Sequence, residues 1–202
     1  MLKKAVKYVL RKLQNKKIGY GTIIIDSEYS DSNWLGCNVS LTKSSLGKYT
    51  YISDDSRIRN CKIGAFCSIG RNVKIGLGFH PTNYISTSPY LYRRSFLGMK
   101  GFSNKDMFLE EDYRNTVVGN DVWIGDNVLI CGGCTINDGV IIGAGSIVTR
   151  DLESYGIYAG VPAKLIRKRE CSYVNLDSIP SEWWELDDHE LSYLIKKHNE
   201  LS

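Results

Sequence analysis

The fold is decided by residues 118–152, which read VGNDVWIGDNVLICGGCTINDGVIIGAGSIVTRDL. Aliphatic residues recur in this stretch at an unbroken spacing of six: Val118, Ile124, Ile130, Ile136, Ile142 and Val148. Four residues after each of them comes a second position, filled by Val122, Val128, Cys134, Val140, Ser146 and Leu152. An α-helix does not explain this spacing, because six residues rotate by about 240° around a helix of 3.6 residues per turn. The repeat therefore predicts short strands stacked in triangular coils around one core.

The first half of the chain carries the same signal with steps of five or six: Leu35, Leu41, Leu46, Ile52, Ile58, Ile63, Ile69 and Ile75. The repeat stops between Ile75 and Val118, and long interruptions of a rigid scaffold often carry function. We therefore predict an all-β solenoid over residues 21–166, with a loop insertion at about 77–116. Short helices are expected on either side, an amphipathic one in residues 1–20 and a helical tail in residues 167–202.

Charge and hydropathy exclude two classes of partner. Seven lysines and arginines fall in the first seventeen residues without an acid, which leaves 19 basic against 22 acidic residues in the remaining chain. The net charge of +4 is thus a property of the tail, and we expect no nucleic-acid groove. The longest apolar runs, such as Ile23–Ile25, are far too short to cross a bilayer.

Six cysteines raise the question of disulfides or a metal site. We read no signal peptide and expect free thiols in a cytoplasmic protein. Cys131-Gly132-Gly133-Cys134 has the CxxC spacing of a zinc site, but it occurs once and Cys134 is in register with the repeat. We therefore predict no bound metal.

The interruption contains the sequence GFHPTNYISTSPY at residues 78–90. His80 is the one histidine near the repeats, since His189 and His198 lie in the C-terminal tail. Imidazole titrates near neutral pH, so His80 is the candidate general base. Its orienting partner is left open between a backbone carbonyl and the acidic residues Glu110, Glu111 and Asp112.

Three motifs in order resemble the hexapeptide-repeat acetyltransferases: Asn120–Gly125, Ile142–Thr149 and Gly160–Lys164. The His80-Pro81 loop and Ser86–Tyr90 are similar to the branch that acetylates xenobiotics and bacterial surface polysaccharides. The resemblance implies a left-handed parallel β-helix, an exception to the right-handed crossover rule. It also implies a homotrimer that binds acetyl-CoA and an acceptor between subunits, with His80 deprotonating the acceptor hydroxyl.

The same resemblance assigns further residues one by one. Trp123 matches an aromatic residue near the thioester, while Ala144 and Thr149 match positions along the pantetheine arm. Lys164 and Arg167 match cations near the CoA phosphates, to which such side chains are attracted. In the loop we expect the acceptor to meet Tyr84, Ser86, Ser88 and Tyr90.

The acceptor and even the enzymatic role stay open at this point. We favour O-acetylation of a saccharide, a cell-surface polysaccharide or its precursor, over acetylation of a streptogramin or chloramphenicol-type drug. The sequence also leaves room for an amino-sugar N-acetyltransferase and for a non-catalytic trimeric scaffold. A carbonic anhydrase built on the same architecture would need three zinc-binding histidines, and only His80 is available.

Each end of the chain carries an amphipathic segment. Residues 2–14 place Leu2, Val6, Val9, Leu10 and Leu13 on one helical face with basic residues opposite. This helix either caps the solenoid, which we favour, or makes a peripheral contact with the inner face of an anionic membrane. After Pro180, we expect Trp183 and Trp184 to anchor a short helix whose N-cap is Asp187 or Asp188.

Overall fold

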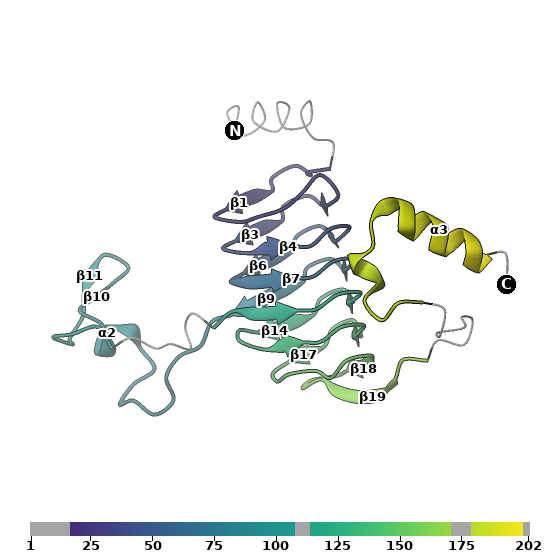
Figure 1. Ribbon diagram of the computed structural model, residues 1–202. Helices are drawn as coiled ribbons and strands as arrows, with labels where there is room; N and C mark the ends of the chain where they lie inside the picture. The colour runs from purple at the N-terminus through teal and green to yellow at the C-terminus, as the bar shows by residue number, and fades with distance from the viewer. Residues whose placement is uncertain (1–16, 108–113, 171–178, 200–202) are drawn as a thin grey trace.

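The computed structural model describes residues 17–107, 114–170 and 179–199. The expected N-terminal amphipathic helix, the acidic residues Glu110, Glu111 and Asp112, and Cys171 lie outside these ranges. The described chain winds into a stack of coils with three β-sheet faces and a C-terminal helix beside the stack (Figure 1). The predicted all-β solenoid is confirmed.

Each coil contributes short strands to three faces, which we call A, B and C. Face A contains β2 (Trp34–Leu35), β5 (Tyr51–Ile52), β8 (Ser68–Ile69), β13 (Trp123–Ile124), β16 (Ile141–Ile142), β18 (Gly156–Ala159) and β19 (Lys164–Lys168). Face B contains β1 (Ile23–Ile25), β3 (Ser40–Thr42), β6 (Arg57–Arg59), β9 (Lys74–Leu77), β14 (Leu129–Cys131) and β17 (Ile147–Val148). Face C contains β4 (Ser45–Leu46), β7 (Cys61–Ile63), β12 (Thr116–Val118) and β15 (Thr135–Ile136). Within these faces neighbouring strands are parallel, except that β19 runs antiparallel to β18.

The core is the column of aliphatic side chains that the six-residue spacing predicts. Ile124, Ile130 and Ile136 are fully buried, and the earlier Leu41, Ile52, Ile58 and Ile69 are buried to the same degree. Strand registers place these residues directly above one another, as in the ladder Ile58, Ile75 and Ile130 on face B. Burying each such side chain contributes about 1.5–3 kcal/mol of hydrophobic stabilisation, so the stack is a continuous rigid support.

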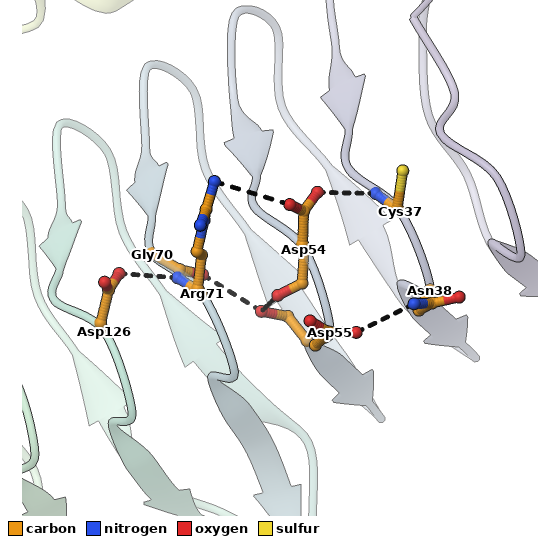
Figure 2. A network of polar contacts seen from close by, with 8 residues as sticks. Cys37, Asn38, Asp54, Asp55, Gly70, Arg71 and Asp126 are labelled. Atoms are coloured by element: carbon orange, nitrogen blue, oxygen red, sulfur yellow. Dashed lines mark hydrogen bonds and ion pairs between the residues drawn. The ribbon is translucent and has the colours of Figure 1, made fainter.

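The corners between faces A and B are closed by polar side chains from the following coil. Asp54 accepts a hydrogen bond from the backbone N–H of Cys37 at 2.8 Å, and Asp126 accepts one from Arg71 at 2.8 Å (Figure 2). A Cβ on Gly36 would lie 2.4 Å from Asp54 Oδ1, so glycine there makes room for the carboxylate. The left-handed backbone itself falls one or two residues later, on Asn38, Asp55, Asn72, Asn127 and Gly145.

The C-terminal segment returns to the earlier coils. Phe66 lies 4.9 Å from the ring of Trp183 in the 3-10 helix η3 (Trp183–Glu185), and the adjacent Trp184 is buried. Asp187 caps α3 (Asp188–Asn199), since Glu190 N–H donates to Asp187 Oδ1 and Asp187 N–H donates to Glu190 Oε2. In the ranges described, no helix has the length and apolar character needed to cross a membrane.

Candidate active site

Residues 78–115 leave the solenoid at the corner between faces B and C, after β9 and before β12. We call this segment the excursion, and its described part, residues 78–107, projects from the side of the stack (Figure 1). His80 lies three residues beyond Leu77, the last residue of β9. The candidate base is therefore held close to rigid β-structure, while the remainder of the excursion extends outward.

A pair of glycines in the next coil holds both roots of the excursion. Gly132 N–H donates to the carbonyl oxygen of Leu77 at 2.9 Å, and a Cβ on Gly132 would lie 2.7 Å from that oxygen and 3.4 Å from the ring of Phe79. Gly133 has a φ of +78°, and a Cβ there would lie 2.9 Å from the Cβ of Arg114. The missing side chains let the outgoing and returning segments approach the solenoid closely.

The imidazole of His80 is oriented by a backbone carbonyl of the excursion. Its Nδ1 lies 2.8 Å from the carbonyl oxygen of Thr87. A carbonyl only accepts hydrogen bonds, so in the neutral ring Nδ1 carries the proton and Nε2 keeps its lone pair. The side chain is exposed, which leaves Nε2 accessible to a proton donor from solution.

The excursion is ordered by its own contacts. It contains the single-turn helix α2 (Pro89–Tyr92) and the hairpin of β10 (Ser95–Phe96) and β11 (Met99–Lys100). Tyr84 packs edge-on against the buried Tyr92 at 5.7 Å, and Tyr90 packs against Phe96 at 5.5 Å. These contacts are made between residues of the excursion itself.

The four residues expected to meet the acceptor all lie on the same excursion as His80. Tyr84, Ser86, Ser88 and Tyr90 are half-buried. Ser86 Oγ accepts a hydrogen bond from the backbone N–H of Ser88 at 3.0 Å. Tyr84 and Tyr90 make the aromatic contacts of the tip, and part of the surface of each stays accessible because both are only half-buried.

The residues expected along the cofactor lie on different sides of the solenoid. Trp123 points outward from face A and is 55% exposed, between Ser68 and Ile141 in the ladder. Ala144 is exposed at the corner between faces A and B, and Thr149 is exposed just after β17 on face B. One copy of the chain does not bring these residues and His80 into a single cleft.

The basic residues of β19, together with Arg169 just after it, divide into paired and available cations. Lys168 and Arg169 are ion-paired with acidic side chains of the solenoid at 3.3 and 2.7 Å. Arg167 donates only to the neighbouring backbone carbonyl of Lys168, at 3.3 Å, and Lys164 has no ion pair within the described ranges. The two cations predicted for the CoA phosphates are thus the two that the fold leaves available.

The buried cysteines are thiols of low reactivity. Burial raises the pKa of Cys67 to about 12 and that of Cys134 to about 11, and it also raises the pKa of Cys61. These thiols stay protonated near neutral pH and are poor nucleophiles and metal ligands. In the part of the chain that the structure describes, no group of three His, Cys, Asp or Glu residues is placed to hold a metal ion.

Sequence reasoning left a backbone carbonyl open as the partner of His80, but it could not say which one, because any residue supplies a carbonyl. It missed the role of one pair of glycines. The Gly132-Gly133 pair was considered only as the centre of a CxxC motif, although two adjacent glycines at a corner are a signal for close backbone approach.

Comparisons with known proteins find relatives of this chain. Residues 115–150 match the family model described as bacterial transferase hexapeptide (six repeats). A chloramphenicol acetyltransferase of Agrobacterium fabrum is 35% identical over 137 residues, which are 66% of this chain and 64% of that protein. A probable macrolide acetyltransferase of Lysinibacillus sphaericus is 38% identical over 133 residues, 64% of this chain and 71% of the relative.

Shorter and more distant matches are also to proteins named acetyltransferases. A galactoside O-acetyltransferase of Escherichia coli is 53% identical over 51 residues, a quarter of each chain. A solved hexapeptide-repeat acetyltransferase of Vibrio cholerae superposes with a TM-score of 0.50 at 21% identity, covering 83% of this chain and 82% of the other. This likeness shows the left-handed β-helical fold. The chain spans 64% and 58% of the first two chloramphenicol acetyltransferases that it matches, less than two thirds of either.

Proposed function

We propose an acetyltransferase activity for this chain, because it belongs to the family of bacterial hexapeptide-repeat acetyltransferases. The proposed reaction moves the acetyl group of acetyl-CoA to a hydroxyl of a saccharide, either a cell-surface polysaccharide or its precursor. His80 is the proposed general base. The observation that carries this proposal is the carbonyl of Thr87 on Nδ1, which leaves Nε2 of an exposed imidazole as the proton acceptor.

The chemistry is a direct transfer. Nε2 of His80 takes the proton of the acceptor hydroxyl while the hydroxyl oxygen attacks the thioester carbonyl, and the CoA thiolate then leaves. A covalent acyl-cysteine is not part of the proposal, since the raised pKa values of Cys61, Cys67 and Cys134 keep these thiols protonated. The proton returns from the imidazolium to the departing thiolate or to solvent.

The proposed cofactor contacts fit the chemistry of CoA. Lys164 and Arg167 are exposed cations without an ion pair in the described part of the chain, and they suit binding to the CoA phosphates. Ala144 offers little side chain at a corner, which suits close approach of the pantetheine arm. Trp123 and Thr149 complete the set as an exposed ring and an exposed hydroxyl.

We propose a homotrimer because the cofactor residues do not converge within one chain. A complete cleft then combines faces of neighbouring copies. Exposed apolar side chains lie both on face A, at Trp34, Tyr51 and Trp123, and on the excursion, at Ile85 and Phe102. Contact between copies would remove such surfaces from water. The proposal also places the protein in the cytoplasm, in keeping with the free thiols of all five described cysteines.

A second acceptor class is favoured by specific relatives. Proteins named chloramphenicol acetyltransferase and macrolide acetyltransferase align over more of this chain than the galactoside enzyme does. A drug hydroxyl would use the same base and the same thioester. We keep the saccharide as first choice because the tyrosines of the excursion suit stacking on a sugar ring. An amino-sugar acceptor would replace the attacking oxygen by nitrogen.

The test compares wild-type protein with His80→Ala and, as a matched control, with His189→Ala, an exposed histidine on α3. Each is mixed with acetyl-CoA and a panel of saccharides, amino sugars, chloramphenicol and a streptogramin. We expect free CoA thiol and an acetylated product from wild type and His189→Ala, and a rate lower by about 10²–10⁴-fold for His80→Ala. If neither CoA nor acetyl-CoA binds wild type, the transferase proposal fails and a scaffold role replaces it.

A further inference from the structure

Apart from the basic first seventeen residues, the positive charge of this protein is concentrated in one stretch of the sequence. Residues 56–105 contain nine basic residues and no acidic residue. The whole chain has a net charge of +4, so the remainder is net negative. The stretch comprises the strands β6 to β9 of the solenoid and most of the excursion. Its basic residues are Arg57, Arg59, Lys62, Arg71, Lys74, Arg93, Arg94, Lys100 and Lys105.

Three of these cations form a strip on the outer side of face B. Arg57 and Arg59 point outward on β6 on either side of the buried Ile58, and Lys74 points outward on β9. The register pairs Arg57 directly with Lys74, and neighbouring strands lie about 4.8 Å apart. Like charges directly opposite each other destabilise a sheet. The arrangement therefore costs stability unless an anion lies against it.

The fold supplies acids to other cations of the same stretch. Arg71 reaches Asp54 at 3.7 Å across the neighbouring corner (Figure 2), and Arg94 is ion-paired with Asp106 at 3.3 Å. Within the described ranges no ion pair involves Arg57, Arg59 or Lys74. The strip is thus left as a positive surface, whereas Arg71 and Arg94 of the same stretch are paired.

The strip lies at the root of the excursion. Lys74 is on β9, the strand that leads into the excursion and ends three residues before His80. Gly76 has a φ of +80°, and a Cβ there would lie 1.9 Å from the carbonyl oxygen of Arg59. The backbone of Arg59 therefore touches the last residues before the chain departs, and the cations share face B with β9, the strand that leads into the segment carrying the base.

We infer that this strip binds a phosphate group of the acceptor. The acceptor would then be a soluble sugar phosphate or nucleotide-linked sugar, a precursor in place of a finished neutral polymer. Arginine offers two parallel N–H donors to phosphate oxygens, and lysine adds a point charge. This inference rests on the proposed acetyl transfer, and it adds a substrate class to it.

The first experiment measures phosphate binding apart from catalysis. Inorganic pyrophosphate, UDP-glucose and glucose are titrated by calorimetry into protein saturated with CoA, so that the CoA phosphates are already bound. We expect pyrophosphate and UDP-glucose to bind wild type and glucose to bind at least about tenfold more weakly. The double variant Arg57→Gln with Lys74→Gln should lose about tenfold or more in affinity for both phosphates. Arg71→Gln, which removes a cation already paired with Asp54, is the matched control and should bind as wild type does.

Three results would overturn the inference. Equal binding of glucose and UDP-glucose would show that the protein does not recognise the phosphate charge. Loss of CoA affinity in the double variant would assign the strip to the cofactor. A change of oligomeric state in the double variant, measured by light scattering, would assign it to contacts between copies. CoA binding to wild type is recorded separately, and its absence would contradict the proposed function, whereas the phosphate titrations without CoA would still decide the inference.

Discussion

Two isoleucines show how differently the solenoid and the excursion are built. Ile130 on β14 is completely buried between Ile75 and Val148 in neighbouring coils, while Ile85 on the excursion is 96% exposed. In the solenoid, every inward side chain is covered because the next coil repeats it. In the excursion, order comes from contacts such as Tyr84 with Tyr92, and apolar side chains remain on the surface. Stability is therefore supplied by the solenoid, whereas the proposed base and the proposed acceptor contacts from Tyr84 to Tyr90 lie on the excursion.

The most severe test of this division is to remove the excursion. Replacing residues 77–115 by a single asparagine would give β9 and β12 the corner that Asn60 forms between β6 and β7. We expect a folded solenoid with a thermal midpoint close to wild type, and transferase activity lower by at least about a thousandfold, because base and acceptor contacts are gone. Circular dichroism melts and thiol release measure both. A shortened chain that does not fold would show that the two regions are not separable.

Truncating one isoleucine in each region tests the same division at single residues. Ile130→Ala should lower the free energy of unfolding by about 2–5 kcal/mol, because it leaves a cavity in a packed column. Ile85→Ala should change it by less than about 0.5 kcal/mol, as for other exposed side chains. Urea unfolding of both variants provides the measurement. Equal losses for the two residues would contradict the proposed division.

The contact between the two regions can be tested at its glycine seat. Gly132→Ala places a Cβ 2.7 Å from the carbonyl oxygen of Leu77, so we expect a loss of about 1–3 kcal/mol and a lower turnover rate as the root of His80 shifts. Gly78→Ala is the matched control, because nothing lies within 4 Å of its Cβ position and its φ is not in the left-handed region. Urea unfolding and turnover are measured for both variants. A Gly132→Ala protein with normal turnover would show that Gly132 does not position the root of His80.

Alkaline pH should weaken the solenoid through its buried thiols. The pKa of Cys67 is raised to about 12 by burial, whereas an unfolded thiol titrates near 9. Between these values the unfolded chain binds fewer protons than the folded one, so stability is intact below pH 9 and falls as pH rises, by up to about 1.4 kcal/mol per pH unit. Urea midpoints of wild type and Cys67→Ala from pH 8 to 10.5 should therefore converge. The exposed Cys37→Ser variant should follow wild type throughout.

The smallest effect is expected at an ion pair of the excursion. Hydrogen bonds and the charge of Arg94 hold the pKa of Asp106 below its usual value. This contact is therefore complete above the ordinary aspartate pKa and is lost as pH falls through the lowered one. Both side chains are exposed, so Asp106→Asn should leave the unfolding midpoint unchanged and only speed proteolysis of the excursion. A lower midpoint of global unfolding in Asp106→Asn would show that this ion pair stabilises the solenoid as well as the excursion.

The solenoid was predictable because its signal is periodic and each repeat restates it. Ile124, Ile130 and Ile136 indicate a shared core by spacing alone, and the structure confirms it. The excursion has no period, so neither the packing of Tyr84 on Tyr92 nor the approach of Thr87 to His80 follows from residue types. The sequence also could not predict which cations lack an ion pair, since only three-dimensional neighbours distinguish Arg57 from the paired Arg71.

The corner glycines constrain how such a chain changes over generations. Gly36 must lack a side chain because Asp54 of the next coil occupies that space, and Gly70 stands in the same relation to Asp126. Where the following coil offers Arg71 in place of an aspartate, the corresponding position holds Ser53. We therefore expect a side chain at Gly36 or Gly70 to be tolerated only together with a change one coil away. The backbone of the next coil restricts the same positions, since a Cβ on Gly125 would lie 2.6 Å from the backbone nitrogen of Ala144.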